Sequence, residues 1–121
     1  MIIKNYSKSV YPISDDFYDY SSFYAQLLNI RYLIKNYILL YEYIIKFNNL
    51  NFHCMLMDIK NAIEYINLSD VYRKVLFDYM IGYSLSDIGK KYKFTRSYAD
   101  FIIKNITIKL RDYLLGVCNE D

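Results

Sequence analysis

The chain has few of the residues that interrupt helices. Its 121 residues include three glycines, one proline and no tryptophan. A fold of many short strands needs a turn about every 8–12 residues, and such turns draw on glycine and proline. Apolar residues make up 55% of the chain, enough to build a buried core. The composition therefore predicts an all-α fold and excludes a disordered chain.

Metal ligands and catalytic sets are also scarce. The chain has one histidine, His53, and two cysteines, Cys54 and Cys118, which lie far apart. Zinc needs about four ligands at clustered spacing, so we expect no metal and no cofactor. There is no Ser/His/Asp set, no paired carboxylate cluster and no glycine-rich phosphate loop, and we therefore expect no enzyme. Free thiols are typical of a reducing, cytoplasmic location.

No segment has the pattern of a membrane span or a secretory signal. The most apolar run, residues 37–47, is interrupted by Glu42 and Lys46. It is too short to cross a bilayer, which takes about 20 residues. The N-terminus lacks a continuous apolar run ending in small residues. We expect a cytoplasmic protein with no membrane partner.

Positive charge is concentrated near the C-terminus. Residues 90–111 hold seven basic side chains and one acidic one, a net charge of +6, whereas the rest of the chain sums to −4. A basic segment in an otherwise acidic protein is typical of a surface that binds a polyanion. The same charge also suits an ordinary solvated helix face, so charge alone leaves both interpretations open.

The first part of the chain divides into an arm and a long helix. Residues 1–16 contain Pro12 and show no helical period, which predicts an N-terminal arm. Residues 17–50 form the second segment, in which one long helix is expected from Phe17 to about Phe47 because no glycine or proline interrupts it.

Apolar residues recur along this long helix at steps of three and four, as in a coiled-coil seam. A second apolar stripe widens the surface, and a helix that is apolar over so much of its circumference must be covered on more than one side. We therefore expect a homodimer. The alternative is that the helix only completes the core of its own protomer. The predicted dimerisation residues are Tyr24, Leu27, Ile34, Ile38, Tyr41 and Ile45.

Residues 51–121 predict a helical domain. An amphipathic helix is expected over residues 53–68 and a second over residues 70–81. Ser69 is a good N-cap for the second helix, and Gly82 stands just past its end, where a left-handed residue is favoured. Residues 84–114 then read as a short helix, a tight turn and a longer basic helix, which is the layout of a helix-turn-helix.

Within residues 84–114 the sequence predicts which side chains face inward. Ser84 and Thr95 are expected to cap the two helices, and Gly89 is expected where the helices approach so closely that only a small residue fits. The buried face of the second helix is predicted to hold Ala99, Ile102, Ile103, Ile106, Leu110 and Tyr113. The opposite face would read DNA bases with Arg96, Ser97, Tyr98, Asp100 and Phe101. Expected phosphate contacts are Lys90, Lys91, Lys93 and Lys104.

Residues 68–110 resemble region 4 of bacterial sigma-70-type factors. The resemblance is carried by Leu68, Ser69, Val75 and Leu76, then by Ser84, Leu85, Ile88, Gly89, Tyr92, Phe94, Thr95 and Arg96, and finally by Ile102, Lys109, Leu110 and Arg111. The chain is too short for a full sigma factor. Its size is similar to that of small sigma-region-4-like regulators of phages and mobile elements. The resemblance implies a helix-turn-helix that binds double-stranded DNA and, in some such proteins, contacts RNA polymerase.

Two departures from the family pattern affect what the resemblance implies. Lys93 stands at a turn position that is often glycine in the family. Asp100 and Phe101 stand where the family's recognition helix usually carries Arg and Gln, so we do not expect the family's usual promoter hexamer as the target.

The sequence thus supports two functional hypotheses. The first is a DNA-binding transcription regulator that uses the helix-turn-helix. The second is a protein-interaction module that docks on RNA polymerase or another regulator through Phe101, Tyr98 and the tyrosine-rich N-terminal helix, with little DNA binding of its own. A phage-packaging or plasmid-maintenance protein with the same fold also remains open.

Overall fold

The computed structural model describes residues 21–118, which form seven helices and no strand within that range. The predicted arm, residues 1–16, and the first residues of the predicted long helix lie outside the described residues. The all-α fold class is confirmed. The helices are α2 (Ser21–Tyr24), α3 (Leu27–Lys35), α4 (Tyr37–Phe47), α5 (Leu50–Tyr65), α6 (Asp70–Met80), α7 (Leu85–Tyr92) and α8 (Arg96–Cys118).

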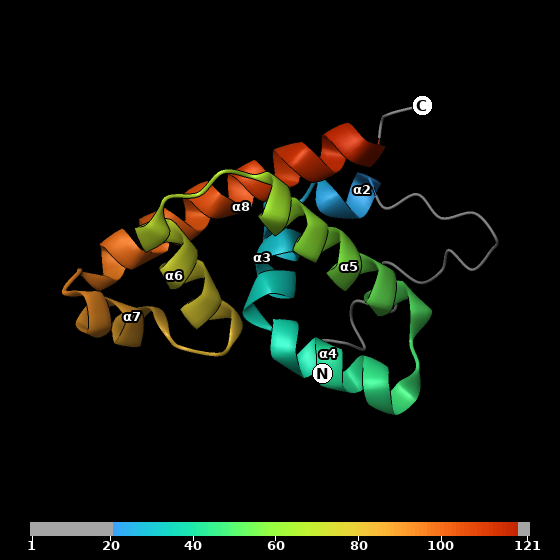
Figure 1. The fold of residues 1–121 in the computed structure, drawn as a ribbon, viewed down its shortest axis with the longest axis horizontal. Helices are drawn as coiled ribbons and strands as arrows, with labels where there is room; N and C mark the ends of the chain where they lie inside the picture. Colours follow the sequence, from blue (N-terminus) through green and yellow to red (C-terminus); the bar gives the residue numbers. More distant parts are fainter. Residues whose placement is uncertain (1–20, 119–121) are drawn as a thin grey trace.

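The C-terminal helix α8 is the central packing element of the bundle. It runs along one side of the molecule, and α2, α3, α5, α6 and α7 all pack on it (Figure 1). Its N-terminal half contacts α7 and α6, and α4 lies farther away, against α5 and α3. Helix α8 therefore joins α6 and α7 to the layer formed by the N-terminal helices.

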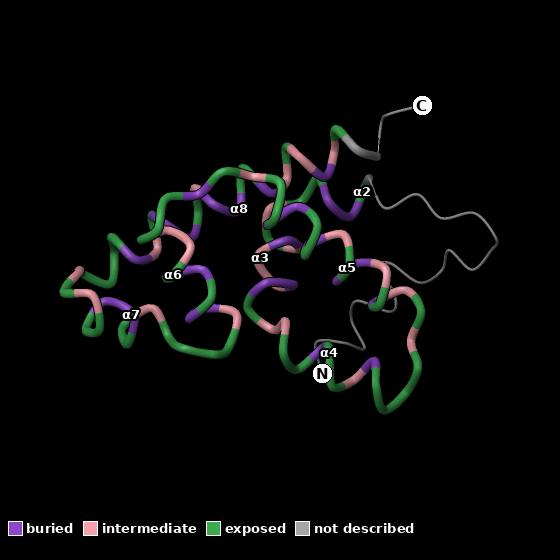
Figure 2. Tube along the Cα trace, in the orientation of Figure 1, coloured by how far each residue is buried: buried purple, intermediate pink, exposed green. Residues whose placement is uncertain are grey.

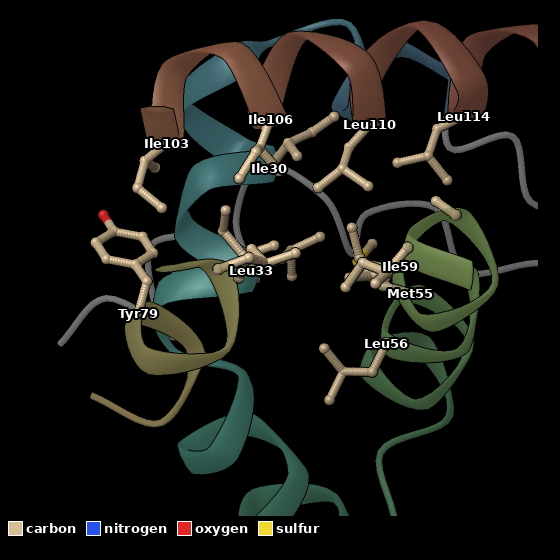
Figure 3. Packing of buried hydrophobic residues seen from close by; sticks show 14 of the residues in the cluster. Ile30, Leu33, Met55, Leu56, Ile59, Tyr79, Ile103, Ile106, Leu110 and Leu114 are labelled. Carbon is tan, nitrogen blue, oxygen red and sulfur yellow. The ribbon is translucent and has the colours of Figure 1, made fainter. Parts of the chain in front are cut away.

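One hydrophobic core fills the space beneath α8. Ile103, Ile106 and Leu110 of α8 point toward Ile30 and Leu33 of α3 (Figure 3). On the other side α5 contributes a further group to the same core, consisting of Met55, Leu56 and Ile59. Buried residues follow the sides on which the helices face one another (Figure 2). Most of the helical stability comes from this shared burial, because short isolated helices are marginal in water.

Side-chain caps mark where α5, α6 and α7 begin. Ser69 accepts a hydrogen bond from the Tyr72 amide at 3.3 Å, and Ser84 accepts one from the Asp87 amide at 3.0 Å. Both caps match the sequence prediction. Asn49 caps α5 by accepting from the Phe52 amide at 3.0 Å, so this helix begins three residues before the predicted position. At the end of α6, Gly82 has φ +115°, as its predicted left-handed role requires.

The prediction of one long helix up to Phe47 was wrong. The chain leaves the helical conformation at Gln26, which is extended (φ −91°, ψ 115°), and again at Asn36 (φ −106°, ψ 21°). The Asn36 side chain donates a hydrogen bond to the Tyr32 carbonyl at 3.0 Å and so competes with the helical backbone pattern. Because of the second break, α3 runs into the core and α4 turns away along α5 (Figure 1).

These breaks divide the predicted dimer seam between the inside and the outside of the protomer. Tyr24 and Ile34 have no exposed surface and belong to the core, so their assignment to a dimer surface is corrected. Leu27 is half-buried. Only the α4 members of the seam are exposed, namely Ile38, Tyr41 and Ile45.

No helix in residues 21–118 is long and apolar enough to cross a membrane. In the same part of the chain, no three His, Cys, Asp or Glu side chains lie close enough together to hold a metal ion. Cys54 is a half-buried free thiol.

Candidate nucleic-acid interface

Helices α7 and α8 are joined by a tight turn. The turn between them spans residues 93–95, and Lys93 adopts the left-handed conformation (φ 63°, ψ 40°) that ends α7. The Phe94 amide donates to the Gly89 carbonyl at 2.7 Å, and the Tyr98 amide donates to the Thr95 hydroxyl at 3.0 Å. The predicted cap at Thr95 is therefore confirmed.

Gly89 lies where the turn folds back on α7. A Cβ atom at this position would stand 2.8 Å from the Phe94 carbonyl oxygen and 3.3 Å from the Thr95 carbonyl carbon. Both neighbours are backbone atoms, which cannot rotate away as a side chain can. The predicted need for a small residue is confirmed, and the close neighbour is the turn itself.

The inner face of the unit fixes the orientation of α8. Ile88 of α7 is fully buried, as are Ala99, Ile102, Ile103, Ile106 and Leu110 of α8, whereas Tyr113 is half-buried. Since side chains three and four apart share one helix face, burying these residues turns the opposite face outward. The predicted readout residues Arg96, Ser97, Tyr98 and Phe101 are all exposed.

Asp100 is the exception, because it is half-buried and both of its carboxylate oxygens pair with cations of the protein. One carboxylate oxygen accepts a hydrogen bond from the Arg31 guanidinium at 2.6 Å, and the other pairs with the Lys104 ammonium at 3.2 Å. Arg31 lies on α3, and its Nε also donates to the Tyr79 hydroxyl of α6 at 3.0 Å. The hydrogen bond from Arg31 is the main cause that lowers the pKa of Asp100. Asp100 thus links α8 to α3, and through Arg31 to Tyr79 of α6.

The predicted phosphate-contacting lysines fall into two groups. Lys91 pairs with Asp78 of α6 at 3.1 Å, and Lys104 pairs with Asp100, so the positive charge of each is partly offset within the protein. Asp78 is nearly buried and also accepts from the Tyr92 hydroxyl at 2.6 Å, a bond that raises the pKa of Tyr92. Lys90 and Lys93 are exposed and make no ion pair within residues 21–118. They carry the uncompensated charge beside the turn.

Aromatic rings form a row that leads from the half-buried Tyr92 and Phe94 to the exposed Tyr98 and Phe101. The Phe94 ring meets the Tyr92 ring at 5.9 Å and the Tyr98 ring at 4.9 Å between centroids, and Tyr98 stacks on Phe101 at 6.0 Å. Tyr98 is 43% exposed and Phe101 is 53% exposed. Mutual contact holds these rings in place in a face that is otherwise polar and basic.

Sequence reasoning missed Arg31 and Asp78, which pair with predicted site residues from outside residues 84–114. Arg31 is 69 residues from Asp100 in the chain, and Asp78 is 13 residues from Lys91. A charged residue in an otherwise apolar helical stripe is the signal that marks Arg31, because such a charge needs a partner when it enters the core.

Comparisons with protein-family models, with curated proteins and with solved structures returned no match to this chain.

Proposed function

We propose that this protein is a DNA-binding transcription regulator of the sigma-region-4-like type, found in the cytoplasm and related in kind to regulators of phages and mobile elements. The observation that carries the proposal is the outward face of α8 at its N-terminal end. Arg96, Ser97, Tyr98 and Phe101 are exposed there, beside Lys90 and Lys93, which make no ion pair within residues 21–118. The first turns of a second helix in this arrangement are the ones that enter a major groove.

In the proposed complex each group has a distinct task. Lys90 and Lys93 approach backbone phosphates and release counterions, which sets the salt dependence of binding. Arg96 hydrogen-bonds a base edge or an adjacent phosphate, and Phe101 contacts a thymine methyl group. Asp100 does not read a base in this scheme. It positions α8 on α3 through Arg31.

The test is a titration of genomic DNA fragments at about 50 mM and 200 mM salt, read by gel shift or fluorescence anisotropy. A regulator binds selected fragments with affinity that falls steeply with salt. Arg96→Ala should weaken that binding by about 1–3 kcal/mol. Lys60→Ala, which removes one exposed charge from α5, should leave it unchanged. Equal binding by wild type and Arg96→Ala would remove Arg96 from the contact set.

A second candidate function is docking on RNA polymerase or on another regulator. The exposed rings of Tyr98 and Phe101 favour it, since adjacent exposed aromatic side chains are typical of protein interfaces. The same titration separates the two, because a docking module has little DNA affinity to lose with salt. If no fragment binds at about 50 mM salt, a pull-down of polymerase with wild type and Phe101→Ala tests the docking function.

We also propose that the regulator is a homodimer formed through α4. Ile38, Tyr41 and Ile45 step along one side of this helix and remain exposed in the protomer. Burying them against a second copy would remove apolar surface from water and set the spacing of two DNA half-sites. Sedimentation should report a dimer for wild type and a monomer for Ile45→Asp. A wild-type monomer at micromolar concentration would exclude this arrangement.

A further inference from the structure

A basic pocket lies between α3 and the helix-turn-helix. It has a volume of about 620 Å³ and is lined by residues of α3, α7 and α8 together with Asn36 and Tyr79. The lining includes three cations, and none of its ten residues is acidic. Besides these cations, the lining side chains able to donate a hydrogen bond are those of Asn36, Ser84, Ser86, Tyr32 and Tyr79.

The charges in this pocket are only partly compensated. Arg31 and Lys35 are four residues apart on α3 and therefore neighbours on one helix face. Arg96 reaches the same pocket from the first turn of α8. Arg31 is paired with Asp100, but Lys35 and Arg96 make no ion pair within the described residues. Three cations from two helices, with one carboxylate between them, leave the pocket electropositive.

Backbone donors border the pocket as well. Leu85 and Ser86 are the first two residues of α7 and line the pocket. Their amides have no acceptor inside the helix, because the first amides of any α-helix lack one. The Ser84 hydroxyl accepts a hydrogen bond from the Asp87 amide, so it leaves the Leu85 and Ser86 amides available to a ligand. The start of α7 thus adds two amide donors to a pocket whose charge comes from the side-chain cations.

We propose that this pocket binds a phosphate group, and that in the complex it is a phosphodiester of the DNA backbone beside the groove that receives α8. The inference rests on the proposed function and extends it, because it places Lys35, outside the helix-turn-helix, in the DNA contact surface. The volume favours a length of backbone over a free ion, which would fill only a small part of it. Arg96 belongs both to the proposed readout residues and to the lining of the pocket, so the two surfaces adjoin.

The experiment measures DNA affinity of Lys35→Ala, Lys35→Arg and the matched control Lys60→Ala between about 50 mM and 200 mM salt. Loss of one phosphate contact lowers the slope of log affinity against log salt by about 0.9. The ratio of wild-type to Lys35→Ala affinity should then shrink about threefold to fourfold across this range. Lys35→Arg should keep the wild-type slope, and Lys60→Ala should match wild type.

A second arm tests the source of the phosphate. Inorganic phosphate is titrated into the free protein, and the amide signals of Leu85 and Ser86 are followed by NMR. Saturable shifts that vanish in Lys35→Ala, together with an unchanged DNA slope, would assign the site to a free phosphate compound and overturn the DNA backbone as its ligand. An unchanged slope without shifts would overturn the site itself. Failure of the proposed function has a different signature, because wild type would then show no salt-sensitive DNA binding at all.

Discussion

The Arg31–Asp100 pair should stabilise the fold by coupling α3 to α8. The nitrogen and oxygen are 2.6 Å apart, and the two side chains are 22% and 26% exposed. Exposed ion pairs contribute about 0–1 kcal/mol, and breaking a buried pair by removing one partner costs about 3–5 kcal/mol. A pair that is three-quarters buried lies between these limits. We therefore expect Asp100→Ala to destabilise the protein by about 2 kcal/mol, out of a typical total of about 5–15 kcal/mol.

A double-mutant cycle isolates the interaction itself. Urea unfolding of wild type, Arg31→Ala, Asp100→Ala and the double variant should give a coupling energy of about 1–2 kcal/mol. The Lys104–Asp100 pair is the control, because it involves the same carboxylate. Lys104 lies one turn away on α8 at 3.2 Å and is 64% exposed, so water screens this pair. The Lys104/Asp100 cycle should give at most about 0.5 kcal/mol. Equal coupling in the two cycles would refute the anchoring role of Asp100.

The pair also predicts a pH dependence. The pKa of Asp100 lies below its ordinary value of 3.8, chiefly because Arg31 hydrogen-bonds to the carboxylate. A carboxyl group whose pKa is lowered on folding stabilises the protein above its unfolded pKa. That contribution is lost as the pH falls through the folded pKa. The difference in unfolding free energy between wild type and Asp100→Asn should therefore be constant from about pH 5 to 7 and shrink below about pH 4. A difference that persists undiminished at pH 2 would contradict the assignment.

Two further predictions concern the turn. Gly89→Ala should destabilise the protein by about 1–2 kcal/mol in urea unfolding, because the new Cβ would stand 2.8 Å from the Phe94 carbonyl oxygen. This strain outweighs the better helix propensity of alanine. An unchanged unfolding midpoint would mean that the turn shifts freely. Lys93→Gly should raise stability by up to about 1 kcal/mol by relieving the positive φ of 63°, and should at the same time weaken DNA binding if Lys93 contacts a phosphate. Loss of stability in Lys93→Gly would show that its left-handed conformation carries no strain.

Much of the fold could be predicted because it depends on neighbours in the chain. Ser69, Ser84 and Thr95 cap the helices that follow them, and each bond reaches only three residues ahead. The apolar steps along α8 identify its buried face for the same reason, since helical geometry alone places those residues on one side. The exposed candidate readout residues follow from that face.

The prediction of one long helix was wrong because the pattern of apolar residues does not show where tertiary packing changes the direction of the chain. The stripe up to Phe47 fits a continuous helix, but burying α3 beneath α8 and α4 against α5 requires a change of direction at Asn36. Packing energy from the whole core outweighs the local preference for continuing the helix. Tyr24 and Ile34 consequently became core residues, and Ile38, Tyr41 and Ile45 stayed on the surface.

The sequence by itself determined the helical class, the caps at Ser69, Ser84 and Thr95, the glycine at the tight turn and the face of α8 that is buried. Each of these depends on backbone geometry within a few residues. Only the tertiary structure decided which charges are free to meet a ligand. Asp100 and Lys91 are neutralised by Arg31 and Asp78, whereas Lys35 joins Arg96 in one pocket. Electrostatic partners are set by distance in space, and the chain brings residues 69 positions apart to within 2.6 Å only when the core has formed.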